Sequence, residues 1–185
     1  MSDPTLVQPG APVRPTPPGA IDGGVFDGGP WKAAFFVEVP GRVSSKSNAR
    51  RYRGSAKVSH TERAAARRQR AYADLVGMVV RAKLPRSWDL GPPPPAPVAS
   101  RPTVACVLVA ATTLDATNVP KTLLDACEGL VFHTDASVRA ASQITVRRAD
   151  DQRLLVGFAL LAADADPVEL AAATTELAGE LARRF

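Results

Sequence analysis

The positions of apolar residues along the chain predict alternating strands and helices. Ala33 to Val39 is a short apolar run with the alternation of a strand, which puts Phe35, Val37 and Val39 on one face. Thr103 to Ala111 is apolar on both faces, which is typical of a strand in the middle of a sheet. We therefore expect a sheet that is covered on both sides.

A long amphipathic helix is expected between these two strands. Ser59 or Thr61 is a suitable N-cap, and Pro85 ends the pattern. Apolar residues recur at helical spacing on one side, as Tyr72, Leu75, Val76, Val79 and Val80. This stripe predicts one buried face and one solvent face.

Two further helices follow along the chain. A short one has Pro120 in its first turn, with Asn118 or Val119 as its cap, and stops near Gly129. The last helix opens with a capping box and presents an apolar stripe. The box is Asp166 and Glu169 around Pro167, and the stripe is Leu170, Leu177, Leu181 and Phe185.

The segment between these helices predicts a β-hairpin. Gln143 to Arg148 and Arg153 to Leu161 flank an Asp150–Asp151 turn. On the second arm one face carries Leu154, Val156, Phe158 and Leu160. The element order becomes β-α-β-α-ββ-α, which indicates an α/β (mixed α+β) domain.

Proline and glycine mark the limits of this domain. Residues 1–30 hold seven Pro and six Gly and few large apolar residues, so we expect a disordered tail there. The folded domain should then cover residues 31–185. Gly91 to Pro97 has five Pro in seven residues and predicts a surface loop or linker.

Composition restricts the class of protein. The chain has 185 residues, of which 45% are hydrophobic, enough for one packed domain. No stretch approaches the roughly 18 apolar residues of a membrane span, so we expect no membrane association. Cys106 and Cys127 lie in apolar runs and predict buried thiols in a reducing compartment. We expect a cytoplasmic protein, and its abundant Arg and Ala fit a phage or prophage of a GC-rich bacterium.

The net charge of +5 hides a strong asymmetry along the chain. Residues 42–86 hold 13 of the 23 Lys and Arg residues but only two of the 18 Asp and Glu residues. Such a block is the electrostatic footprint of a phosphate-backbone binder. The cations that we expect to contact DNA are Lys46, Arg50, Arg51, Arg53, Arg63, Arg67 and Arg70. The alternative is a solvated helix face with no partner.

Carboxylates and a lysine gather around the short helix in the sequence. Asp115 follows the central strand, Lys121 lies in the first turn of that helix, and Asp135 comes after it. The strand, the short helix and the segment that follows it are expected to bring Asp115, Lys121 and Asp135 to one edge of the sheet. Carboxylates hold Mg²⁺, and a lysine stabilises the charge of a phosphodiester transition state. By spacing alone, helix capping or a loop position is the alternative for each Asp.

The same segment resembles a known family. Asp115-Ala-Thr-Asn118-Val-Pro-Lys121-Thr-Leu-Leu-Asp125-Ala resembles the D-x-D-N-x-x-K-x-x-x-D-A motif of RusA-type Holliday junction resolvases. Thr134-Asp135-Ala-Ser-Val is similar to the D-D-x-Q/S-V segment of that family. Val39 to Asn48 is similar to its first strand and following loop. The resemblance covers about residues 33–161.

The resemblance implies a homodimeric endonuclease that uses Mg²⁺, or Mn²⁺ in its place, to cut opposed strands of a four-way DNA junction. Asp115 and Asp135 match the metal-binding aspartates. Lys121 matches the catalytic lysine, Asn118 the asparagine beside the metal ligands, and Asp125 the helix aspartate. A two-fold symmetric dimer suits paired symmetric cuts.

Two positions depart from the family pattern. Thr117 stands where the family has the second Asp of D-x-D, and Thr134 where it has the first Asp of D-D. The hydroxyl of Thr117 can still serve the metal, and we count this residue with the catalytic set. Fewer formal charges weaken Mg²⁺ binding. The alternatives are therefore a weak or inactive junction-binding protein on the same fold, or an Arg-rich protein–protein module.

Overall fold

The computed structural model describes residues 23–40, 60–93, 95, 101–111, 119–146 and 152–185, without the side chains of 60–63 and 65. This part of the chain forms a mixed α/β fold with one five-stranded sheet. The strands are β1 (Gly23–Val25), β2 (Ala33–Val39), β3 (Thr103–Ala111), β4 (Val138–Val146) and β5 (Arg153–Leu161). The α-helices are α1 (His60–Lys83), α2 (Val119–Cys127) and α3 (Pro167–Arg184), and η2 (Asp135–Ser137) is a 3₁₀ turn.

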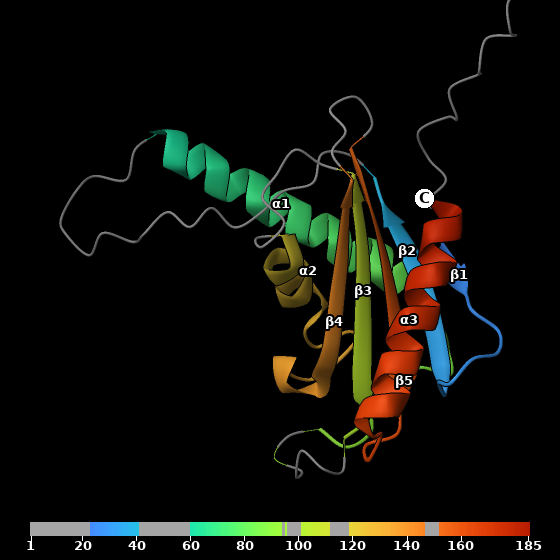
Figure 1. Ribbon diagram of the computed structural model, residues 1–185. Helices are drawn as coiled ribbons and strands as arrows, with labels where there is room; N and C mark the ends of the chain where they lie inside the picture. The colour runs from blue at the N-terminus through green and yellow to red at the C-terminus, as the bar shows by residue number, and fades with distance from the viewer. Residues whose placement is uncertain (1–22, 41–59, 94, 96–100, 112–118, 147–151) are drawn as a thin grey trace, which may run out of the picture.

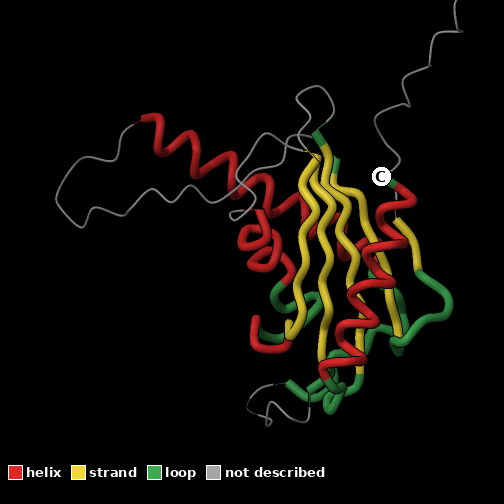
Figure 2. The backbone as a smooth tube through the Cα atoms, in the orientation of Figure 1, coloured by secondary structure: helices red, strands yellow, loops and turns green. Residues whose placement is uncertain are grey.

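The sheet has the strand order β1-β2-β5-β3-β4, and α-helices cover both of its faces. Figures 1 and 2 show α1 and α2 on one face and α3 on the other. β3 and β4 are parallel and are joined through α2. β5 runs antiparallel to both of its neighbours, β2 and β3. The β3–α2–β4 unit is therefore a parallel crossover at one end of the sheet.

Strand alternation divides the core into two layers. On β2, Phe35 and Val37 face α1 and α2, whereas Phe36 faces α3. β3 and β5 alternate in the same way, because successive side chains of a strand point to opposite faces. The predicted strands 33–39 and 103–111 are thus confirmed, and all nine residues of β3 are buried.

Aromatic rings fill the centre of the layer beneath α1 and α2. The Phe35 ring lies 5.4 Å from that of Phe158 and meets Trp88 edge-on at 4.9 Å. Phe35 and Phe158 are fully buried. Rings at these separations gain packing energy beyond their buried area. This cluster ties β2 and β5 to the segment that follows α1.

The predicted helix signals are confirmed at three places. The Asp166 carboxylate accepts from the backbone N–H groups of Val168 and Glu169 at 2.7 and 2.8 Å, and the Glu169 carboxylate accepts from the Asp166 N–H. This is the predicted capping box of α3. α1 ends at Lys83, before Pro85, and Gly129 follows α2 with a φ of +77°. α1 begins at His60, so Thr61 lies inside the helix and is not its cap.

The predicted hairpin is wrong. β4 and β5 are not neighbours: β4 pairs with β3 in parallel, and β5 lies between β2 and β3. β4 also begins at Val138, five residues before the predicted start. The physical reason is burial, because β5 is apolar on both faces and gains most in the centre of a sheet. β4 has no buried residue and takes the edge.

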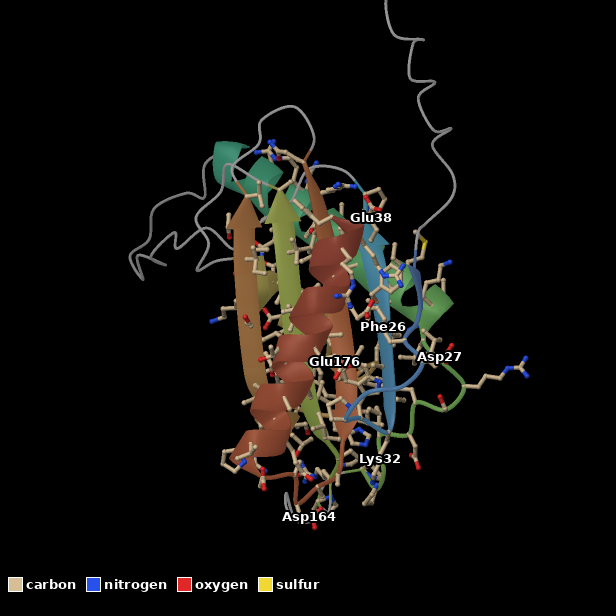
Figure 3. All side chains as sticks on the ribbon, turned by 45° about the vertical axis from the view of Figure 1, so that its right-hand side comes forward. Phe26, Asp27, Lys32, Glu38, Asp164 and Glu176 are labelled. Atoms are coloured by element: carbon tan, nitrogen blue, oxygen red, sulfur yellow. The ribbon has the colours of Figure 1, made fainter. Side chains whose placement is uncertain are left out.

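The predicted boundary of the N-terminal tail is too late. Gly23–Val25 forms the edge strand β1, which pairs antiparallel with β2. Phe26 is buried and packs its ring 5.2 Å from that of Phe36, while its N–H donates to the carbonyl of Ala34. Figure 3 shows Phe26 between the sheet and α3. Residues 1–22 lie outside the described part of the chain.

Both cysteines are free and buried, as predicted. Burial raises the pKa of the Cys127 thiol to about 12 and holds that of Cys106 well above its usual value. Among the described residues, no helix is long and apolar enough to cross a membrane.

These thiols predict a loss of stability at alkaline pH. The unfolded chain releases thiol protons near pH 9, whereas Cys127 in the folded protein holds its proton until about pH 12. The free energy of unfolding should therefore be unaffected by these thiols below pH 9 and should fall as the pH rises from 9 toward 12. Denaturant titrations at several pH values measure this slope. A slope in the Cys127→Ala variant as steep as that of the wild type would contradict the prediction.

Candidate functional site

The β3–α2–β4 unit positions the two described residues of the predicted catalytic set. Lys121 lies in the first turn of α2, directly after Pro120, whose fixed φ suits a helix start. Asp135 is the first residue of η2, which leads into β4. Val138 pairs with Val104, so Asp135 lies near the amino ends of β3 and β4. Both side chains are exposed.

The backbone around Asp135 forms a single tight turn. Thr134 precedes it in extended conformation, with φ −149° and ψ 156°. The N–H of Ser137 donates to the carbonyl of Thr134 at 2.9 Å, and the N–H of Val138 donates to that of Asp135. Ser137 is buried, which anchors the turn against the protein. The carboxylate of Asp135 is thereby held outward at the start of β4.

The hydroxyl of Thr134 is buried and has no hydrogen-bond partner within the described residues. It does not cap η2 either, although Thr134 stands at the N-cap position. An unsatisfied buried hydroxyl costs about 1–3 kcal/mol, so a polar partner at this point is energetically favoured. The position is the one where the RusA pattern has an aspartate.

The loop after α1 braces the segment that carries Asp135. The indole N–H of Trp88 donates to the carbonyl of Val131 at 3.0 Å, and the Nε2 atom of His133 lies 3.3 Å from the carbonyl oxygen of Gly91. Val131 and the neighbouring Phe132 are buried. His133 therefore has a structural contact. Sequence reasoning missed this bracing, because nothing local in the sequence links residues 88–91 to 131–133.

The described residues do not by themselves form the predicted metal site. Lys121 and Asp135 make no ion pair with each other in this part of the chain, and they flank α2 at its two ends. No group of three His, Cys, Asp or Glu residues in the described ranges is arranged to hold a metal ion. The other predicted members of the site lie outside these ranges: Asp115, Thr117 and Asn118. The predicted convergence of Asp115 with Lys121 and Asp135 stays a prediction.

The amino-terminal half of α1 carries the described part of the predicted DNA-binding surface. Arg67 and Arg70 are exposed, as is Arg68, which the sequence prediction left out. Figures 1 and 2 show this half of α1 extending beyond the sheet. From residue 66 to 71 no side chain is buried, and the next one, Tyr72, is buried. The predicted contacts outside the described residues and side chains are Lys46, Arg50, Arg51, Arg53 and Arg63.

The cations on the projecting half of α1 do not stabilise the described part of the fold through ion pairs. Neither Arg67 nor Arg70 makes an ion pair within the described part of the chain. Cations in the first half of a helix also gain nothing from the helix dipole, which favours them at the other end. The arrangement is suited to an external polyanion.

A scan of the chain against models of known protein families found no match, and a search of curated proteins found none either.

Proposed function

We propose that the protein is a RusA-like, Mg²⁺-dependent endonuclease that binds four-way DNA junctions and hydrolyses opposed strands as a homodimer. The observation that carries the proposal is the agreement between the motif order and the β3–α2–β4 unit. The lysine of the motif, Lys121, occupies the first turn of α2, and the later aspartate, Asp135, lies outward before β4. The resemblance in sequence supplies the rest of the assignment.

The residues around Asp135 are compatible with a hard cation. Asp135 offers an exposed carboxylate to solvent, whereas the hydroxyl of Thr134 is buried and is not counted as a ligand. Asp115 is proposed as the second carboxylate ligand. When bound, Mg²⁺ lowers the pKa of a coordinated water and neutralises charge on the leaving oxygen. The Lys121 ammonium adds a positive charge that favours the transition state over the bound substrate.

The cationic half of α1 is proposed to hold the phosphate backbone. Arg67 and Arg70 lie three residues apart and so share one side of the helix. Arg68 extends the positive surface around it. Backbone contacts of this kind position a duplex arm without reading its sequence.

A second candidate function is junction binding without cleavage. Thr117 and Thr134 replace two carboxylates of the RusA pattern, which lowers the charge available to Mg²⁺. The cationic surface of α1 serves this function equally well. The two candidates differ only in hydrolysis, so both make the same prediction for binding.

Reversing Arg67 and Arg70 to Glu together is expected to weaken four-way junction binding by about tenfold or more and to reduce the salt slope by about two. Fluorescence anisotropy with a labelled junction between 50 and 200 mM salt, about the range where phosphate contacts dominate, measures both quantities. The matched control is Lys32→Glu with Arg183→Glu, which changes the net charge equally at exposed positions elsewhere. Equal weakening by the two pairs would contradict a DNA contact at α1 and would favour a protein–protein module.

A further inference from the structure

A groove of 740 Å³ runs between α1 and α2. Its α1 wall includes Asp74, Gly77, Met78 and Arg81, and its other wall is formed by α2 and the residues that follow it. Met78 is 58% exposed, unusual for a large apolar side chain in the middle of a helix that packs on the core. The groove lies apart from Asp135 and from the cations at Arg67 and Arg70.

The four α1 residues lie on one stripe of the helix. Their spacing of three, one and three residues places them on a single face, opposite to the buried stripe at Tyr72, Val76 and Val79. Asp74 and Arg81 are seven residues apart, or about 10 Å along the axis, which is too far for an ion pair within one helix. Neither makes a side-chain hydrogen bond or ion pair in the described part of the chain.

This stripe is complementary to itself when the direction is reversed. An antiparallel copy of α1, placed with a two-fold axis between Gly77 and Met78, brings Asp74 opposite Arg81 of the copy and Arg81 opposite Asp74. Gly77 and Met78 are consecutive residues and lie on opposite flanks of the stripe, so the same operation brings Met78 beside Met78 of the copy and Gly77 beside Gly77 of the copy. One axis thus gives two opposite-charge pairs and an apolar contact between the two exposed methionines, the repetition that a two-fold interface requires.

We propose that this stripe of α1 is the interface between two copies of the chain. This interface would hold together the homodimer of the proposed function, and the inference rests on that proposal. The charges favour a second copy over an unrelated apolar partner, because the two-fold arrangement pairs the anion of the stripe, Asp74, with its cation, Arg81. Opposed charges at matched positions fix the register of such an interface.

The absence of a side chain at Gly77 fits a close approach of two helices. A Cβ atom at Gly77 would lie 3.7 Å from the carbonyl oxygen of Ala126 and 3.8 Å from a methyl group of Leu130, ordinary contact distances. The glycine therefore is not required by the packing of α1 against α2. Its lack of a side chain instead lets the two helices approach closely where Gly77 faces Gly77 of the second copy, and the two Met78 side chains meet on the other flank. Methionine adapts well to the irregular gaps of such a contact.

The dimer also places the cationic surfaces symmetrically. Arg70 lies about 11 Å from the proposed axis along α1, and Arg67 about 16 Å. The antiparallel arrangement directs the projecting half of each α1 to the opposite side of the axis. A substrate with paired duplex arms would then meet two equivalent positive surfaces.

Charge exchange across the interface tests the proposal. Asp74→Arg alone and Arg81→Asp alone each create two like-charge contacts, and each is expected to raise the dimer dissociation constant by about 100-fold. The double variant with both changes restores opposite pairs and is expected to return the dissociation constant to within about tenfold of the wild type. Sedimentation equilibrium of the full chain without DNA measures these constants. The controls are Glu176→Arg, on the outer side of α3 (Figure 3), and Arg86→Asp, in the loop after α1, which match the two charge changes at other exposed sites.

Rescue by the double variant supports the interface. A wild-type chain that is monomeric, or a dimer that neither single change weakens, overturns it; the second result would favour another surface, such as the free edge of β4. Gly77→Leu provides a second measurement, because a large side chain at this position would hold the two copies of α1 apart and should weaken the dimer while circular dichroism stays unchanged. Junction binding by the monomeric single variants would leave the DNA proposal standing, so the two proposals fail separately.

Discussion

Replacing Asp135 with Asn is expected to reduce Mg²⁺-dependent cleavage of a four-way junction by at least about 100-fold. The amide keeps the shape of the side chain but removes the charge that a hard cation requires, and stabilisation by such a metal is worth several kcal/mol. Each loss of about 1.4 kcal/mol in transition-state stabilisation lowers the cleavage rate about tenfold. Asp135 is exposed and holds its turn through its backbone carbonyl, so the fold should be unaffected.

The measurement is the single-turnover rate on a labelled junction, together with thermal unfolding of each protein. Asp27→Asn is the matched control: Asp27 is an exposed aspartate in the loop between β1 and β2, at the opposite edge of the sheet from β4 (Figure 3). Junction affinity should be retained in both variants, because binding depends on the cations of α1. An Asp135→Asn protein that cuts at the wild-type rate would remove Asp135 from the metal site.

Phe158→Ala is expected to lower the free energy of unfolding by about 3–5 kcal/mol, the usual cost of deleting a fully buried ring. Phe158 is completely buried on the central strand β5, and its ring packs against that of Phe35. Strands β2 and β3 both pair with β5, so surrounding elements cannot easily close the cavity. A loss of this size is a large part of the stability of an ordinary domain.

Chemical denaturation followed by circular dichroism measures this effect. Val168→Ala is the comparison, because Val168 is 75% exposed and its truncation should change stability by less than about 0.5 kcal/mol. Phe158→Leu should fall between the two. A Phe158→Ala protein as stable as Val168→Ala would show that the aromatic cluster is not the centre of the core.

Local sequence patterns predicted most of the fold. The strand of residues 33–39 has the predicted bounds because alternation and the following Pro–Gly pair act locally. The capping box at Asp166 and Glu169 is a contact within four residues and needs no tertiary information. Strand pairing cannot be predicted in this way, because the apolar sequence of β5 does not specify which strands lie beside it. Only the competition for central positions shows that β5 separates β2 from β3 and leaves β4 at the edge.

The predicted boundary of the tail at residue 30 was wrong for a related reason. Gly23 and Gly24 have no propensity for a strand, and pairing with β2 supplies the backbone hydrogen bonds that make one. Phe26 is buried by Phe36 of β2 and by residues of α3. The α3 contacts come from a distant part of the chain, so local composition does not reveal them. The Pro- and Gly-rich composition of residues 1–30 gave no local sign of the strand at Gly23–Val25.

The places of Lys121 and Asp135 in the fold were predictable from the sequence, whereas their surroundings were not. The spacing of Lys121 and Asp135 around α2 follows from the sequence, because Pro120 and Gly129 define that helix. The orphan hydroxyl of Thr134 and the bracing by Trp88 depend on packing between distant segments. The self-complementary stripe on α1 was hidden for the same reason, since exposure of Met78 depends on where α2 lies.

Cleavage of a synthetic four-way junction tests the central claim most directly. The labelled junction is incubated with the wild-type protein, with Mg²⁺ and with EDTA, beside a linear duplex of the same sequence. The account predicts paired nicks on opposed strands of the junction that require the metal, and no comparable cutting of the duplex. Tight, salt-sensitive binding with no cut in Mg²⁺ or Mn²⁺ would contradict the enzyme assignment and leave a junction-binding protein on this fold.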